Sequence, residues 1–260
     1  MALSSAELQD LMLARSCLEN PSMAARISNI VGSPIEKGFE MLPEKWHQVV
    51  NDATRKSIET GLDVALWTLD QNRPETPSSN WWHKLAVGTS GAAGGAFGLA
   101  ALAIELPVST TIMLRSIADI ARSEGENLAT PEAKLQCMQV LALGGRATND
   151  DAAETGYFAA RAAMARAVSD AAAHLAKKGL ADKGAPALIR LIAQIASRFS
   201  IVVSEKAAAQ AVPVVGAFGG AFINTLFIDH FQDVGKGHFI IRRLERLHGP
   251  EEIRRAYLQL

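Results

Sequence analysis

A carboxylate follows each of the two long uncharged stretches of this sequence. Glu105 comes directly after residues 85–104, and Asp229, followed by His230, comes directly after residues 207–228. Carboxylates and imidazoles hold divalent metals and transfer protons in hydrolases. If the two stretches pack in parallel, these side chains meet, whereas antiparallel packing of 20-residue helices separates them by about 30 Å. A metal-dependent hydrolase using these three residues is therefore one hypothesis.

The spacing of the polar residues argues against catalysis. His230 and His238 are eight residues apart, and we expect Gly235 and Gly237 to interrupt the helix between them. Zinc hydrolases place two histidines at i, i+4 on one helix, which this sequence lacks. The Gly-rich stretches also lack the lysine and the strand context of a phosphate-binding loop. We therefore expect no catalytic residue, no metal and no cofactor.

Glycine spacing within the uncharged stretches indicates helix packing. Glycines recur at i, i+3, i+4 and i+7 in the first stretch and at i, i+3 and i+4 in the second, which leaves one helix face without side chains. Each glycine costs up to about 1 kcal/mol in a helix relative to alanine, so close packing of a partner helix must offset that cost. The predicted packing residues are Gly91, Gly94, Gly95, Gly98, Gly216, Gly219 and Gly220.

Two tryptophans and a lysine precede the first uncharged stretch. Trp81, Trp82 and Lys84 are of the types that favour a membrane interface, where indoles and long basic side chains reach the lipid headgroups. The stretch is long enough to cross a membrane, but its glycines make independent insertion marginal. The sequence thus predicts contact with a membrane surface, with closure of one end of a helical bundle as the alternative role of the tryptophans.

The remaining sequence predicts an all-α protein, a helical bundle with the two Gly-rich segments packed at its centre. Thr130-Pro131 is a typical helix start and Gly144-Gly145 a typical end. The polar, proline-containing run 71–80 divides the chain into N-terminal helices and a loop (1–80) and a helical core (81–260), and we expect both parts to belong to one domain. Near the C-terminus, three arginines are expected on a solvated face: Arg242, Arg243 and Arg246.

Charge and cysteine content limit the classes of function. The chain has 26 Lys and Arg against 27 Asp and Glu, a net charge of -1, which excludes a general nucleic-acid-binding protein. Its two cysteines, Cys17 and Cys137, are too few for a disulfide framework and are expected to be buried thiols. The N-terminal sequence shows no secretory signal, so a cytoplasmic location is expected.

Two runs of this sequence resemble the EcsC protein family. They are 84–144, with a Gly-rich helix expected to close on the turn Glu105-Leu106-Pro107, and 188–249, with a Val-Pro-x-x-Gly-x-x-Gly-Gly segment. The resemblance covers the chain from about Leu42, and Glu105 keeps the carboxylate where an aspartate is typical. It implies a bacterial protein with a weak membrane association, and it supplies no catalytic residues.

The hypothesis favoured by the sequence is an accessory protein without catalysis. It would be cytoplasmic, peripheral to the inner membrane, and in contact with membrane lipid or a membrane protein. A helical scaffold for soluble partners, without lipid contact, is the other non-enzymatic alternative.

Overall fold

The computed structural model describes residues 3–19, 22–31, 36–68, 98–145, 156–179, 184–212 and 220–260. These ranges contain helices and no strand, which confirms the all-α prediction. The helices are α1 (Ser5–Leu18), α2 (Met23–Val31), α3 (Glu36–Glu40), α4 (Trp46–Thr68), α6 (Gly98–Ser123), α7 (Pro131–Leu143), α8 (Gly156–Lys178), α9 (Pro186–Ala211), α11 (Gly220–His248) and α12 (Pro250–Gln259).

Local sequence explains several helix boundaries. Ser4 caps α1 and forms a capping box with Glu7, in which the Ser4 hydroxyl and the Glu7 carboxylate each bond to the other residue's backbone N–H. Thr130 caps α7 ahead of Pro131, as the sequence predicts. Gly249 has a φ of 86°, a conformation that favours glycine, and it separates α11 from α12.

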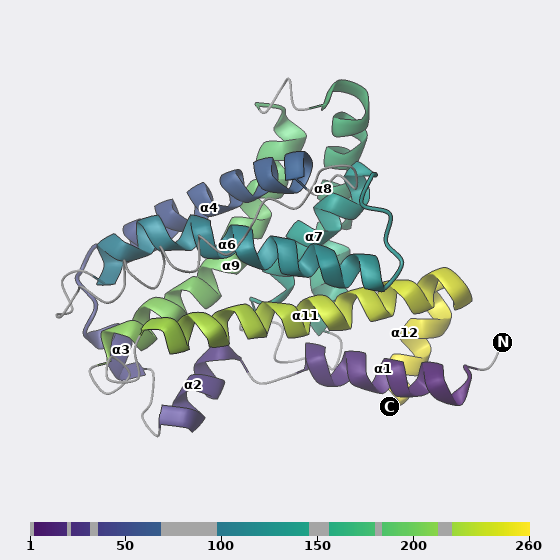
Figure 1. Cartoon of the computed structure of the whole chain (residues 1–260), viewed down its shortest axis with the longest axis horizontal. Coiled ribbons are helices and arrows are strands. Elements are labelled where there is room, and N and C mark those ends of the chain that lie inside the picture. Colours follow the sequence, from purple (N-terminus) through teal and green to yellow (C-terminus); the bar gives the residue numbers. More distant parts are fainter. Residues whose placement is uncertain are drawn as a thin grey trace.

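The helices pack in two groups around α11, which runs along the length of the molecule (Figure 1). On one side, α4 lies along α6, and both belong to the main core with α7 and α9. On the other side, α1 lies along α11 and meets α12, so the two ends of the chain lie on the same side. α8 covers α7 and α9. Cys17 and Cys137 are free and buried, as expected.

α9 is the single described helix long and apolar enough to cross a membrane by length and composition. Within the bundle, however, it packs against α4, α7 and α8. Leu188, Leu191, Ile195 and Phe199 are buried on it at helical spacing. This packing buries one face of α9, but only 33% of its most apolar 18-residue stretch is buried within the protein.

Two predictions of helix ends were wrong. α6 continues through Pro107, where the sequence predicts a turn, although proline removes one helical hydrogen bond. α11 likewise continues through Gly235 and Gly237. A Cβ at Gly237 would lie 2.7 Å from Leu18 Cγ and 2.9 Å from the carbonyl oxygen of Ala14. Glycine is therefore needed at Gly237 so that α1 can approach α11 closely.

Candidate functional site

Most of the predicted packing and membrane-interface residues lie outside the described residues. Only Gly98 and Gly220 are described, as the first residues of α6 and α11. The proposed helix packing and membrane contact at the other positions stay predictions. The positions outside the described ranges are Gly91, Gly94, Gly95, Gly216, Gly219, Trp81, Trp82 and Lys84.

Glu105 lies in a buried ion pair between α6 and α9. The Lys206 Nζ donates to Glu105 Oε1 over 2.7 Å, and the two side chains are 0% and 8% exposed. The same ammonium lies 4.6 Å from the ring centroid of Phe227 on α11, a cation–π contact. Burial lowers the pKa of Lys206, and the neighbouring Glu105 carboxylate offsets part of this decrease. This pair joins three helices.

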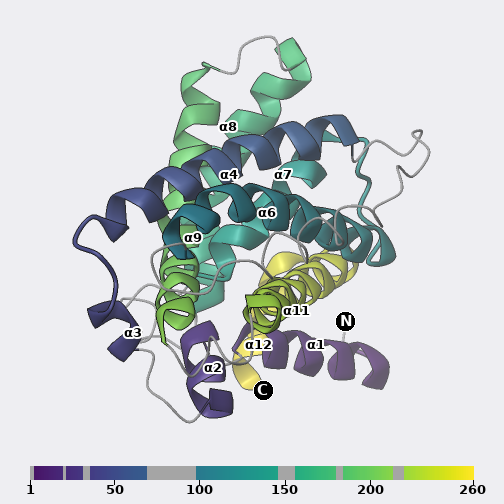
Figure 2. The same cartoon turned by 60° about the vertical axis from the view of Figure 1, so that its left-hand side comes forward.

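The ion pair shows that the described parts of the two uncharged stretches (98–104, 207–212 and 220–228) lie near the same end of the molecule. The first stretch runs into α6 just before Glu105, and the second begins just after Lys206 and includes Phe227. We call this part of the protein, formed by the first turns of α6 and α11 and the last turns of α9, the Glu105 end. Figure 2 brings this end, which is on the left of Figure 1, toward the viewer.

Apolar side chains are exposed at the Glu105 end. Ile104, one residue before the buried carboxylate, is 77% exposed. α3 packs on the end of α9 so closely that Gly38 has no room for a Cβ beside the carbonyl of Ala208. Met41, just after α3, is also exposed. This surface thus combines exposed aliphatic groups with an internally neutralised charge pair.

His230 has a partner elsewhere in the fold. Its Nε2 lies 2.9 Å from the carbonyl oxygen of Gly144 and donates to it, and its ring packs on that of Phe231. Glu105 pairs with Lys206 instead of with a histidine. Within the described ranges, no group of three His, Cys, Asp or Glu side chains could hold a metal ion. The hydrolase hypothesis requires Glu105, Asp229 and His230 to act together. The positions of Glu105 and His230 therefore give it no support.

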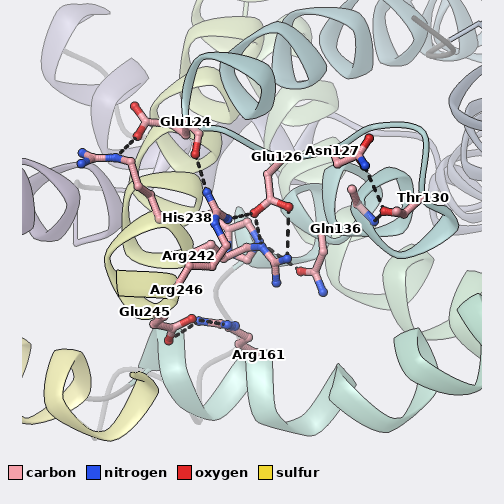
Figure 3. A network of polar contacts seen from close by, with 12 residues as sticks. Glu124, Glu126, Asn127, Thr130, Gln136, Arg161, His238, Arg242, Glu245 and Arg246 are labelled. Atoms are coloured by element: carbon pink, nitrogen blue, oxygen red, sulfur yellow. Dashed lines mark hydrogen bonds and ion pairs between the residues drawn. The ribbon is translucent and has the colours of Figure 1, made fainter. Parts of the chain in front are cut away.

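A second polar region lies between α7, α8 and α11 (Figure 3). Sequence analysis named His238, Arg242 and Arg246 but did not bring them together in one site. Arg161 of α8 forms a bidentate pair with Glu245, with distances of 2.8 and 2.6 Å. Arg242 forms another with Glu126, at 2.7 and 3.2 Å. Such fork-like pairs fix both partners in orientation as well as in distance. Burial raises the pKa of Glu126, but the bonds and charges of Arg242 and Arg246 outweigh it and lower the value overall.

The prediction of a solvated face for the C-terminal arginines holds only in part: all three pair with acidic groups, and Arg242, Arg243 and Arg246 are 16%, 30% and 41% exposed. Arg243 donates to Asp10 and Glu124, and Arg246 donates to Glu126. The arginines join α11 to α1 and to the turn after α6. Leu247, on the same helix, is 63% exposed.

A chain of hydrogen bonds crosses the centre of the polar region. The Tyr157 hydroxyl lies 2.9 Å from Nδ1 of the fully buried His238, and Nε2 of His238 lies 3.2 Å from Gln136 Oε1. Because the amide oxygen can only accept, Nε2 carries the proton and Nδ1 accepts from Tyr157. Burial, aided by the charges of Arg161 and Arg242, lowers the pKa of His238 well below 6.5, so the imidazole is neutral. Burial raises the pKa of Tyr157 to about 12, consistent with a protonated donor.

A cavity of about 530 Å³ opens beside this chain. Gln136 and Gln139, one helical turn apart on α7, lie on its wall. Gln139 is 1% exposed, and neither of its amide atoms has a hydrogen-bond partner in the described part of the chain. An unsatisfied buried polar group costs about 1–3 kcal/mol. Gln136 and Gln139 had no distinctive signal in the sequence, since their helix also carries Glu132 and Lys134.

The family model of the EcsC protein family matches residues 6–244. The match begins within α1, earlier than the resemblance seen in the sequence, and it ends in α11. Comparison with curated proteins and with solved structures gives no match. The match includes the Glu105 end and the polar region around His238 except for Glu245 and Arg246, which lie just beyond it.

Proposed function

This chain belongs to the EcsC protein family, and from that premise we propose that it is a membrane-peripheral accessory protein that contacts lipid through the Glu105 end. The observation that carries the proposal is the exposure of Ile104 directly beside a buried, neutralised ion pair. An aliphatic side chain in this position can enter the lipid interface without taking an unpaired charge with it. The proposed location is the cytoplasmic side of the inner membrane.

The placement of the uncharged stretches supports the same surface. The first stretch ends at Ile104, and the second begins after Lys206, so both adjoin the Glu105 end.

Flotation with vesicles of phosphatidylethanolamine and phosphatidylglycerol tests the proposal. The full-length protein should float with the vesicles, and Ile104→Glu should reduce the floating fraction. Leu247→Glu is the matched control, because Leu247 is 63% exposed but lies 20 residues beyond Phe227 along α11, or about 30 Å away. Equal flotation of both variants, or no flotation of the parent protein, would contradict the proposed surface.

Tryptophan fluorescence tests the part of the proposal that concerns Trp81 and Trp82. Vesicles should shift the emission of the parent protein to shorter wavelength, because indoles move to a less polar interface. The double variant Trp81→Ala/Trp82→Ala removes the expected reporters while leaving Trp46 and Trp67 in place. An unchanged shift in the double variant would exclude these two tryptophans from the interface.

A further inference from the structure

The cavity between α7, α8 and α11 has one long apolar wall. Its volume of about 530 Å³ falls within the range of about 300–1,000 Å³ typical of ligand pockets. The wall comes from α8, whose lining side chains are mostly small and apolar: Ala165, Val168, Ala172, Ala173 and Ala176. At about 1.5 Å per residue, Ala165 and Ala176 lie about 16 Å apart along the helix. The wall is therefore long enough for an extended aliphatic chain of medium length.

Polar side chains line the cavity at one end of this wall. Arg161 lies one helical turn before Ala165 on α8. Gln136 of α7 and Arg242 of α11 line the cavity with it. His238, which bonds to Gln136, lies one turn before Arg242 on α11, so these side chains gather where the three helices meet (Figure 3). We call Gln136, Arg161 and Arg242 the head site.

Gln136 offers hydrogen-bond donors at the head site. Its side-chain oxygen accepts from His238, so the amide nitrogen keeps both of its N–H groups. This nitrogen has no partner among the described residues, and, unlike the two amide atoms of Gln139, it is not fully enclosed by protein. A ligand in the cavity can therefore reach it.

The two arginines of the head site also keep unpaired donors. Arg161 uses Nη1 and Nη2 for Glu245, which leaves its Nε without a partner in the described part of the chain. Arg242 uses Nε and Nη2 for Glu126, which likewise leaves Nη1 without a partner there. Neither nitrogen is fully enclosed, and the two side chains are 21% and 16% exposed. The head site thus presents N–H groups from three helices to the cavity.

The ion pairs at the head site leave one positive charge in surplus. Arg242 and Arg246 share the carboxylate of Glu126. Arg161 has the carboxylate of Glu245 to itself. Three guanidinium groups therefore face two carboxylates in this buried part of the cavity, which favours a ligand with one negative charge.

Other charged groups nearby do not reverse this balance. Arg243 pairs with Asp10 and Glu124, and none of these three lines the cavity. Glu132 lines the rim but is exposed, so solvent screens its charge. With Glu132 counted, positive and negative groups at the cavity are equal in number. A single negative charge can enter on these terms, whereas a phosphate dianion would exceed the surplus.

We propose that this cavity binds a monocarboxylate with an aliphatic chain, such as a medium-chain fatty acid, with its carboxylate at the head site and its chain along the wall of α8. A carboxylate accepts several hydrogen bonds through its two oxygens, so it can satisfy donors of Gln136 and the arginines together. The chain buries apolar surface against the α8 side chains. The inference stands independently of the proposed membrane contact, since the cavity lies among α7, α8 and α11, away from the Glu105 end.

Calorimetric titration of the protein with sodium octanoate tests this inference. Octanoate should bind. Octanol, which has the same chain length but no charge, should bind at least about tenfold more weakly, because it cannot balance the surplus guanidinium. Acetate, which has the carboxylate without the chain, should show no measurable binding.

Gln136→Glu tests the head site itself. The new carboxylate keeps an oxygen for Nε2 of His238, but it replaces the N–H donors and cancels the surplus positive charge. It should weaken octanoate binding by about tenfold or more. Gln48→Glu is the matched control, because Gln48 is exposed on α4 outside the cavity and the variant has the same net charge. Its octanoate binding should equal that of the parent protein.

Two further variants locate the bound octanoate. Ala173 is exposed on the rim, so Ala173→Phe should fill the cavity and abolish binding without disturbing the core. Ile104→Glu, at the Glu105 end, should bind octanoate like the parent protein, which separates this site from the proposed lipid surface. The inference is overturned if octanoate does not bind, if octanol or acetate binds as tightly, or if Gln136→Glu binds octanoate as tightly as Gln48→Glu. Loss of binding in Ile104→Glu, or unchanged binding in Ala173→Phe, would also overturn it.

Discussion

Replacing Lys206 by methionine should destabilise the protein strongly, because it leaves Glu105 buried without its counter-charge. The side chains are 0% and 8% exposed, and they meet at 2.7 Å. Removing one partner of a buried ion pair costs about 3–5 kcal/mol. Methionine keeps the length of the side chain and its contact with the Phe227 ring, so little of this loss comes from packing. At about 2–4 °C per kcal/mol for a chain of this size, the melting temperature should fall by roughly 6–20 °C.

Urea unfolding followed by circular dichroism measures this loss. The double variant Glu105→Gln/Lys206→Met should recover most of the lost stability, since neither side chain then carries a charge. Arg55→Met is the control for an exposed pair: Arg55 and Glu59 are 71% and 50% exposed, and their separation should cost no more than about 1 kcal/mol. The reasoning is refuted if Lys206→Met costs no more than Arg55→Met, or if the double variant is no more stable than Lys206→Met.

Three further predictions concern α11 and the polar region. The pKa of Glu126 is lowered, so its contribution to stability is present above pH 4.5 and is lost as the pH falls through the folded-state pKa. Glu126→Gln should therefore flatten the acid limb of a curve of stability against pH. An unchanged acid limb would contradict this. Gly237→Ala should lower the free energy of unfolding in urea by about 1–3 kcal/mol, because the new Cβ meets α1. The new Cβ of Gly235→Ala meets its nearest neighbour at 3.5 Å, so this variant should be neutral or gain up to about 1 kcal/mol. The reverse order of the two variants would disprove the close approach of α1 to α11. Nitrogen-15 NMR should show His238 as the neutral Nε2–H tautomer at pH 6.5, because its pKa lies well below that value. Stability should fall as the pH drops below 6.5, because the unfolded chain then takes up a proton that the folded chain does not. An imidazolium signal from His238 at pH 6.5 would exclude the assigned hydrogen bonds.

Sequence predicted those elements of the fold that are set by local chemistry. Thr130-Pro131 starts α7 where predicted because the threonine side chain satisfies a free backbone N–H and the proline needs none. Pro107 and Gly237 misled the prediction because tertiary contacts override their local preferences. The Glu105–Lys206 pair holds α6 two residues before Pro107, and the close approach of α1 requires a glycine at Gly237.

The candidate sites were less predictable than the fold. Glu105 was singled out because it ends an uncharged stretch, but its partner Lys206, 101 residues away, had no local signal. The same limit applies to His238, which depends on Tyr157 and Gln136 from two other helices. Gln139 was missed because glutamine is a good helix former and is normally exposed, so its burial depends on how α8 packs over α7.

The most direct test of the membrane contact is a fluorescent probe at the proposed surface. Ile104→Cys and Leu247→Cys each place one thiol on the exterior, while native Cys17 and Cys137 are buried, so an environment-sensitive probe such as a nitrobenzoxadiazole label should react mainly at the new site. With vesicles of phosphatidylethanolamine and phosphatidylglycerol, the probe at position 104 should brighten and shift to shorter wavelength, and the probe at position 247 should not change. A response at position 247 alone, or at neither position, would contradict lipid contact through the Glu105 end.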